Sequence, residues 1–502
     1  MARVVGGLMV FALLSTWSLL VAGDILFPTN RSSFPDGFMF GAGAAAYQSE
    51  GGPLENGRGP CIWDAFIAAT PEKVSDGSNA SVTNDFYHHY KDDIKLMKYM
   101  GLDSYRFSIS WSRIFPKGNV NKGVNPVGVQ FYNDLIDELV ANDIKPFVTL
   151  LHFDNPQALE EEYGGPLNST FVRDYANYAD FCFKTYGDRV KYWATINEPD
   201  IFTLIGYALG NSAPGRCSSY VGNCTAGNSA TEPYIVAHNL ILSHGAAARL
   251  YKKKYQPGQK GEIGITLATT NYKPLENTAE DTAAASRAFD FTAGWFLHPL
   301  TYGDYPKSMK RLVGNRLPKF TKNQSNELVE TLDFITYNYY FSDYAHATPQ
   351  NGVNVSYTTD GLYNESSVDE NGNPFGSTTT YAGFYSYPQG IEDVALYLKE
   401  KYKNPVLYVS ENGAPDNASL PMSTLLQDNV RINYTTNHLS KLLSAIEKGA
   451  NVKGYYAWNF LDDFEWTSGY KERYGFVYVD FENNQTRYLK ASAEWFKTFL
   501  SN

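Results

Sequence analysis

The chain lacks several features that would assign it to other classes of protein. Beyond its N-terminal region it has no apolar run long enough to cross a membrane, and it has no long low-complexity tract. Its 4 cysteines have spacings that do not fit a zinc site. No Gly-x-Gly-x-x-Gly motif follows the first predicted strand, which weakens a dinucleotide-binding interpretation. We therefore expect a globular protein with neither a bound metal nor a cofactor.

The chain is also poor in positive charge. It has 42 basic side chains against 53 acidic ones, for a formal net charge of −11. A negatively charged protein is repelled by phosphate backbones, so a nucleic-acid partner is not expected. Aromatic residues, in contrast, make up 15% of the chain; a surplus of rings is able to line a ligand site, but any single one is more often a core or sheet residue. The composition leaves the oligomeric state open.

The N-terminal residues resemble a secretory signal peptide. Arg3 gives a positive start, residues 4–21 are largely apolar, and Val21 and Gly23 are the small residues expected just before a cut. We predict that residues 1–23 are removed and that residues 24–502 form one mature domain. A membrane anchor is the weaker alternative, because serine and threonine interrupt an apolar run that is barely long enough to span.

Two further features suit export. Cys217 and Cys224 bracket a short turn-forming stretch and are able to close a loop disulfide in an oxidising compartment. Cys61 and Cys182 have apolar neighbours, and we predict that both are buried free thiols. Ten glycosylation sequons suit the secretory pathway, at Asn30, Asn79, Asn168, Asn223, Asn323, Asn354, Asn364, Asn417, Asn433 and Asn484. We expect a secreted or vacuolar protein without a membrane segment after processing.

Short β-branched and aromatic runs alternate with amphipathic segments along the mature chain. The predicted strands are Phe38–Ala42, Ser104–Ile109, Pro146–Leu151, Tyr192–Ile196, Glu262–Leu267, Phe334–Tyr337, Val406–Ser410 and Gly454–Trp458. The clearest predicted helices are Asp92–Met100, Phe131–Val140 and Leu439–Glu447. Eight strands alternating with helices predict an α/β protein with a single closed (β/α)8 TIM barrel, and an open doubly wound sheet is the alternative.

One long connection interrupts this alternation. The stretch from about Gln350 to Gly383, between the sixth and seventh predicted strands, is rich in glycine, serine, threonine and asparagine. We interpret it as a surface insertion between a strand and its helix. In a barrel such an insertion lies where it is able to wall the mouth of a site.

Two of the predicted strands end in a glutamate beside an asparagine. The fourth ends in Thr-Ile-Asn-Glu-Pro at residues 195–199, and the seventh ends in Ser-Glu-Asn-Gly at residues 410–413. The carboxyl ends of barrel strands meet at one rim, so Glu198 and Glu411 are expected to face each other. Hydrolysis of a glycosidic bond requires such a pair, one carboxyl protonated and the other ionised.

These motifs resemble glycoside hydrolase family 1, in particular the plant β-glucosidases. The resemblance runs from Phe-Pro-Asp-Gly-Phe-Met-Phe-Gly at residues 34–41 to Ala-Glu-Trp-Phe at residues 493–496, nearly the whole mature chain. It implies a retaining β-glucosidase that removes terminal β-D-glucosyl residues from small glycosides through a covalent glucosyl-enzyme. The resemblance further implies that Glu198 is the acid/base and Glu411 the nucleophile.

The resemblance also implies a sugar pocket. It assigns the stacking platform to Trp458, a hydrogen bond to the nucleophile to Tyr340, and contacts with the far hydroxyls to Gln48 and Glu465. A sugar has an apolar face to stack on and a rim of hydroxyls that need paired donors and acceptors. The full set of implied substrate-binding residues is Gln48, His152, Asn197, Asn338, Tyr340, Trp458, Glu465 and Trp466.

The sequence departs from the family pattern at two positions near these residues. Phe153 stands where tryptophan is usual after the histidine, and Asp463 stands where asparagine usually precedes Phe-Glu-Trp. Neither change removes a catalytic group, but both leave the strictness of glucose preference open. The segment around Cys217 and Cys224 resembles the plant loop that carries a disulfide, and we predict that these two cysteines pair.

Other functions remain as alternatives. A transglucosidase that passes glucose from an activated donor such as an acyl-glucose to an acceptor hydroxyl would use the same two glutamates. A sugar-binding protein without activity is disfavoured because both carboxylates are present. The myrosinase branch replaces the acid/base glutamate by glutamine, whereas Glu198 is present here. A ureide hydrolase is a remote alternative, and the aglycone and the final compartment, apoplast or vacuole, are not readable.

Overall fold

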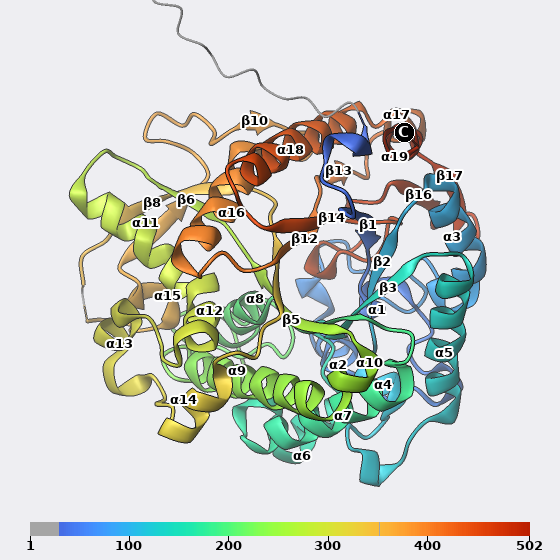
Figure 1. The fold of residues 1–502 in the computed structure, drawn as a ribbon. Helices are drawn as coiled ribbons and strands as arrows, with labels where there is room; N and C mark the ends of the chain where they lie inside the picture. Colours follow the sequence, from blue (N-terminus) through green and yellow to red (C-terminus); the bar gives the residue numbers. More distant parts are fainter. Residues whose placement is uncertain (1–29, 351, 502) are drawn as a thin grey trace, which may run out of the picture.

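Residues 30–350 and 352–501 of the chain are described by a computed structural model. The predicted signal peptide at residues 1–23 lies outside the described residues. Eight parallel strands close into a barrel in the order β1-β14-β12-β7-β5-β4-β3-β2, seen at the centre of Figure 1. They are β1 (Met39–Gly43), β2 (Ser104–Ser108), β3 (Lys145–Leu151), β4 (Tyr192–Asn197), β5 (Glu262–Ala268), β7 (Phe334–Asn338), β12 (Leu407–Asn412) and β14 (Val452–Ala457).

The predicted barrel is confirmed, and the open-sheet alternative is wrong because the sheet has no edge. All eight predicted strands are present, with ends that differ by at most two residues. β14 begins two residues before its predicted start, and β12 ends two residues after its predicted end, continuing through Glu411 and Asn412. Their backbones pair with Asn338 of β7 and Ala457 of β14, so neighbouring strands extend β12 beyond its apolar run.

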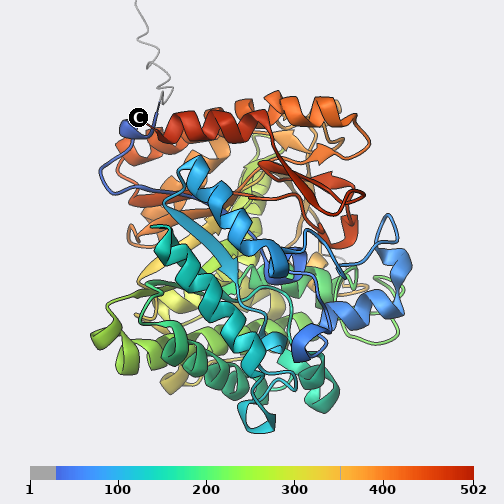
Figure 2. The ribbon, with the colours of Figure 1, turned by 90° about the vertical axis from the view of Figure 1, so that its right-hand side faces the viewer.

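Helices follow the strands and surround the barrel (Figures 1 and 2). The three predicted helices lie inside longer ones, and α3 is capped at its C-terminus by Gly101, whose φ of 77° is a left-handed conformation that glycine tolerates best. The main helices are α3 (Phe86–Met100), α5 (Pro126–Ala141), α7 (Thr170–Tyr186), α9 (Glu232–Leu250), α11 (Ala279–Phe291), α12 (Ala293–Tyr302), α16 (Gln389–Lys401), α18 (Asn429–Glu447) and α19 (Ala491–Leu500). The shorter ones are α1 (Ala46–Ser49), α2 (Ile62–Ala69), α4 (Trp111–Ile114), α6 (Gln157–Tyr163), α8 (Pro199–Thr203), α10 (Gln256–Gln259), α13 (Lys307–Val313), α14 (Lys322–Leu328), α15 (Tyr357–Asp360) and α17 (Met422–Gln427).

Aromatic side chains fill part of the barrel interior. Phe147 of β3 has its ring centroid 5.5 Å from Phe334 of β7, 5.9 Å from Tyr408 of β12 and 5.4 Å from Tyr456 of β14. None of these strands neighbours β3 in the sheet, so the rings meet across the interior. The barrel is therefore a packed core rather than a pore, and polar side chains concentrate where the strands end.

The connections carry small sheets of their own. These are β6 (Asn271–Pro274) with β8 (Ser342–Ala347) and β9 (Tyr363–Ser366), β10 (Ser377–Thr378) with β11 (Tyr385–Ser386), β13 (Asp416–Asn417) with β15 (Glu472–Arg473), and β16 (Val477–Asp480) with β17 (Thr486–Leu489). The predicted insertion from Gln350 to Gly383 is confirmed as a long connection between β7 and α16, and its described part contains α15, β9 and β10.

The predicted cysteine pairing is confirmed. Cys217 and Cys224 form a disulfide across seven residues, with a Cα–Cα distance of 5.5 Å. Cys61 and Cys182 are buried free thiols, as predicted.

Near the chain ends, Phe34 packs with its ring centroid 6.4 Å from that of Phe499 in α19, so the first described segment lies beside the last helix (Figure 2). Among the described residues, no helix is both long and apolar enough to cross a membrane.

Gly41 in β1 gives a test of barrel packing. A Cβ there would lie 2.5 Å from the Ser104 carbonyl oxygen and 2.5 Å from the Tyr456 ring. Gly41→Ala is therefore expected to reduce the free energy of unfolding by about 1–3 kcal/mol, measured by thermal or denaturant unfolding. Gly258→Ala in α10 is the control, because no atom lies within 4 Å of its added Cβ. Equal stability of the two variants would contradict this packing.

Candidate active site

Ten candidate catalytic and sugar-binding residues were predicted, and they gather at the carboxyl ends of the barrel strands. Eight line one cavity of about 480 Å³, namely Gln48, His152, Glu198, Tyr340, Glu411, Trp458, Glu465 and Trp466. The other two, Asn197 and Asn338, are each 1% exposed, and Asn338 donates both to Glu198 and to Asn197. Each residue follows or ends a strand, so the barrel brings them together from segments far apart in sequence.

Arg106 of β2 lies at the centre of the site. Its Nη1 donates to Glu411 Oε1 at 2.6 Å, and its Nη2 donates to Asn197 Oδ1 at 2.6 Å. Sequence reasoning assigned Arg106 no role, although an arginine inside an otherwise uncharged strand needs a buried acceptor. That mismatch signals a buried role for Arg106 but does not identify its partners. Tyr340 donates its hydroxyl to the second oxygen of Glu411 at 2.7 Å, the contact implied by the family resemblance.

Asn338 connects the two glutamates. Its amide nitrogen donates to Glu198 Oε1 at 2.8 Å, and its amide oxygen accepts the Ser410 hydroxyl at 2.6 Å. In the sheet, Asn338 is paired with Glu411 across β7 and β12. Asn338 therefore bonds Glu198 through its side chain and neighbours Glu411 through its backbone.

The two glutamates lie in different electrostatic environments. Burial, and then the charge of Glu411, raises the pKa of Glu198 well above its usual value. Burial also raises the pKa of Glu411, but the Arg106 cation and the Tyr340 hydroxyl oppose that rise. No cation among the described residues hydrogen-bonds Glu198. At one pH, Glu198 therefore holds its proton more readily than Glu411 does.

Arg106 also fixes the tautomer of His152. Because a guanidinium only donates, Asn197 must present its oxygen to Arg106 and its amide nitrogen to His152 Nε2, at 3.0 Å. His152 Nε2 is thus an acceptor, and the ring proton resides on Nδ1. Burial lowers the pKa of His152, so the ring is neutral. Its Nδ1–H has no partner among the described residues and is a donor available to a ligand in the cavity.

Gln48 and Glu465 form the far wall of the cavity. The Gln48 amide nitrogen donates to Glu465 Oε2 at 3.1 Å and to the Phe464 carbonyl at 3.1 Å. The Gln48 amide oxygen is buried without a partner among the described residues. An unpaired acceptor beside a carboxylate is suited to the donor hydroxyls of a sugar.

The two departures from the family pattern differ in position. Phe153 lines the cavity and packs against Trp466, with ring centroids 5.2 Å apart. Asp463 is 4% exposed and is not among the lining residues, and it accepts from the Asn459 amide at 2.7 Å. Burial raises the pKa of Asp463 well above its usual value. Phe153 thus contributes to the shape of the cavity, whereas Asp463 supports the loop behind it.

Backbone geometry explains why one motif ends in glycine and the other in proline. In Glu-Asn-Gly, a Cβ on Gly413 would lie 1.9 Å from the Trp458 carbonyl oxygen, so only glycine allows β12 to approach that segment. In Asn-Glu-Pro, Pro199 is the first residue of α8, where its missing N–H costs nothing. Glu198 therefore lies at the junction of β4 and α8. In the described part of the chain, no cluster of three or more His, Cys, Asp or Glu residues is placed to hold a metal ion.

Comparison with known proteins assigns the site to a family. The sequence model of glycosyl hydrolase family 1 matches residues 30–502. The chain belongs to this family. It is 54% identical to β-glucosidase 17 of Arabidopsis thaliana, over 94% of this chain and 92% of that protein. It is 52% identical to furcatin hydrolase of Viburnum furcatum, over 93% of this chain and 86% of that protein.

A solved structure agrees in fold. A mutant of a rice β-glucosidase, in a covalent complex with Glc from GA4GE, matches with a TM-score of 0.92 and 44% identity. The match covers 94% of this chain and all of that one. The family 1 chain described here is therefore a glycoside hydrolase of the β-glucosidase type, acting on a glycoside.

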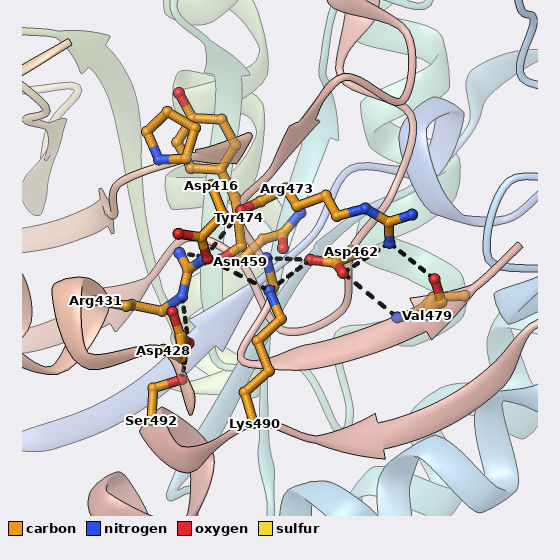
Figure 3. A network of polar contacts seen from close by, with 12 residues as sticks. Asp416, Asp428, Arg431, Asn459, Asp462, Arg473, Tyr474, Val479, Lys490 and Ser492 are labelled. Carbon is orange, nitrogen blue, oxygen red and sulfur yellow. Dashed lines mark hydrogen bonds and ion pairs between the residues drawn. The ribbon is translucent and has the colours of Figure 1, made fainter. Parts of the chain in front are cut away.

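A buried ion network supports the family 1 site from behind (Figure 3). Arg431 lies between Asp416 at 2.6 Å and Asp428 at 2.9 Å, and it also donates to the Tyr474 carbonyl at 2.8 Å. Tyr474 lines the catalytic cavity. The network thus connects α18 to the cavity wall.

The second half of the network holds the loop that carries Asp463 and Glu465. Asp462 is completely buried and accepts from Lys490 at 3.1 Å and from Arg473 at 3.0 Å. Lys490 is also completely buried and lies 3.9 Å from Asp416, which joins the two halves. Three cations and three carboxylates therefore balance one another away from water.

This balance predicts the effect of Lys490→Met. The variant leaves the Asp462 carboxylate short of a partner in the interior, so we expect a loss of about 3–5 kcal/mol in the free energy of unfolding. Adding Asp462→Asn removes the unpaired charge and should cost less than the sum of the single changes. Lys95→Met is the control, because its ion pair with Asp92 is mostly exposed and screened by water, so its loss should change stability little. Additive losses in the double variant would contradict the charge balance.

Proposed function

We propose that this family 1 enzyme is a retaining β-glucosidase that removes terminal, non-reducing β-D-glucosyl residues from small glycosides. Glu411 is the nucleophile and Glu198 the general acid and base. The observation that carries the proposal is the unequal environment of the two carboxyls. A cation bonds Glu411 at 2.6 Å, whereas an uncharged amide bonds Glu198 at 2.8 Å. Retention requires one ionised nucleophile and one protonated acid.

In the first step, ionised Glu411 attacks the anomeric carbon while Glu198 protonates the departing glycosidic oxygen. Arg106 keeps Glu411 ionised at a pH where Glu198 still holds its proton. A covalent glucosyl-enzyme forms, and the aglycone leaves as an alcohol or phenol. Once Glu411 is esterified it no longer carries charge, so the pKa of Glu198 falls.

In the second step, Glu198 acts as a base. The lowered pKa lets it accept a proton from water, which attacks the anomeric carbon from the side that the aglycone left. Two inversions give net retention, and Glu198 is protonated again for the next substrate. The Tyr340 hydroxyl and the Arg106 guanidinium both bond the Glu411 carboxylate, so they stabilise its charge as it leaves the sugar.

The relatives support an enzyme that transfers a glucosyl group, but they do not point to a single aglycone. The rice β-glucosidase whose structure was matched carries a covalent Glc, and we transfer that intermediate to Glu411 here. Relatives with similar identity bear different substrates in their names, such as furcatin hydrolase. Glucose preference therefore rests on Gln48, His152 and Glu465, which present donors and acceptors around the far side of the cavity. The transglucosidase alternative receives no support from the comparisons.

The proposal includes export. Eight of the ten sequon asparagines are exposed, and Asn30 and Asn417 are half-buried. The Cys217–Cys224 disulfide is typical of an oxidising compartment. Secretion, cleavage after residue 23 and use of the sequons stay predictions. N-terminal sequencing and the mass change on deglycosylation of the secreted protein test all three.

Azide rescue tests the division of labour between the glutamates. Glu198→Ala should still be glucosylated by dinitrophenyl β-glucoside, because that leaving group needs no acid. Azide needs no base, so it should release β-glucosyl azide from this variant. In Glu411→Ala, azide should attack directly from the vacated side and give the α-azide by one inversion. Proton NMR coupling distinguishes the anomers, and the opposite pair of products would reverse the two roles.

Arg106 provides a separate test through the pH profile. Arg106→Gln removes the cation that lowers the pKa of Glu411, so ionised Glu411 persists only at higher pH. The acidic limb of kcat/KM against pH should therefore move upward, by about 1–3 pH units. Arg106→Lys keeps the positive charge and should move the limb less. A reduced rate with the acidic limb unmoved in both variants would show that Arg106 does not tune Glu411.

A further inference from the structure

A second hollow adjoins the mouth of the catalytic cavity. It has a volume of about 240 Å³ and is lined by nine residues from β8, β9 and the segment leading into β11. Phe341, Gly383 and Phe384 line both hollows. The rings of Phe341 and Phe384 lie 6.2 Å apart and edge to face, so they form the divide between the two. A ligand that extends out of the catalytic cavity across this divide reaches the second hollow.

Asp343 is the most unusual residue of this hollow. It is only 8% exposed, yet its carboxylate accepts no hydrogen bond and has no ion pair among the described residues. Burial, and then the nearby charge of Glu365, raises its pKa to about 7. Its carboxyl oxygens are not among the fully buried polar atoms of the described residues, so they open onto the hollow, where no described side chain donates to them.

The rest of the lining is also rich in acceptors and rings. Glu365 receives the Tyr272 hydroxyl at one oxygen, at 2.9 Å, and its other oxygen bonds no described residue. No lysine, arginine or histidine lines the hollow. Phe341 is 41% exposed, and Tyr385 adds a further ring. Acceptors beside an exposed aromatic face complement a sugar ring, which has hydroxyl donors at its rim and an apolar face.

A short segment of the chain, residues 340–343, connects the catalytic cavity to the second hollow. Tyr340 bonds the nucleophile, Phe341 forms the divide, and Asp343 lies in the second hollow. The divide formed by Phe341 and Phe384 thus lies between Asp343 and the catalytic cavity. A ligand group at Asp343 lies beyond this divide and therefore belongs to the leaving part of the substrate.

We propose that this hollow, centred on Asp343, is a distal subsite that binds a sugar ring carried by the aglycone. The inference rests on the proposed function, because it assumes cleavage of a β-glucoside in the adjoining cavity. Asp343 and Glu365 accept hydroxyl hydrogen bonds from that ring, and the exposed face of Phe341 packs on it. The enzyme would thus favour β-glucosides whose leaving part is itself glycosylated over those with a bare leaving group.

Oligosaccharide length tests the subsite on the intact enzyme. Hydrolysis of p-nitrophenyl β-glucoside, cellobiose, cellotriose and cellotetraose is followed by release of glucose. We expect kcat/KM to rise about tenfold at the length at which a ring first reaches the hollow, because hydrogen bonds to a charged group are gained there. In Asp343→Ala that rise should disappear through a higher KM, while the rates on p-nitrophenyl β-glucoside and cellobiose stay within about twofold.

Two controls separate binding from folding. Asp343→Ala and Asp343→Asn should melt no lower than the unaltered enzyme at pH 8, because each removes a largely buried charge that bonds no described residue. Glu447→Gln, at the exposed end of α18, should change neither the melting temperature nor the length dependence. A kcat/KM that is flat with length, or a rise that survives in Asp343→Ala, overturns the subsite. Absence of activity on p-nitrophenyl β-glucoside and cellobiose would instead count against the proposed function.

Discussion

The ion pair between Arg106 and Glu411 is the interaction on which the active site depends. Glu411 is only 4% exposed in the catalytic cavity, and burial alone favours the neutral form of a carboxyl group. One guanidinium compensates for that burial and, through its second nitrogen, orients Asn197 and hence His152. The same cation therefore sets a charge, an amide orientation and a tautomer. Glu198 lies outside its direct reach, and the difference in proton affinity between the two glutamates follows from this.

The same constraint extends behind the site. The loop between β14 and β15 supplies Trp458, Glu465 and Trp466 to the cavity, and it has little regular structure of its own. Buried charges anchor it instead, because Asp462 accepts from Lys490, from Arg473 and from the Gly475 backbone. Such a network is not strong evidence for net stability, since desolvation offsets much of the attraction. Its directional bonds do specify one arrangement of a loop that apolar packing alone would leave less defined.

How far the sequence predicted the structure depended on the kind of residue. The strands were found because β-branched and aromatic runs are long enough to identify, and their ends were missed by one or two residues where polar residues such as Glu411 continue a ladder. The motif residues were placed correctly because strand ends converge in a barrel. Arg106 was overlooked because its partners lie 91 and 305 residues away, and a single sequence does not show such contacts. Asp343 was overlooked for the same reason, since the burial of a side chain depends on the fold and does not show in the local sequence.

This contrast separates two parts of the substrate site. Most groups of the proposed glucose site lie on or shortly after barrel strands, where the sheet register fixes them within narrow limits, and Glu465 and Trp466 lie on the loop that the buried charges anchor. The groups at the mouth, among them Phe341, Tyr381 and Phe384, lie on the connection between β7 and α16. Loops are not tied to a ladder and accept changes of length and sequence at small cost in stability. Chemistry on the sugar and selection of the leaving group are thus encoded in structurally separate parts of the chain, and only the first follows from the family motifs.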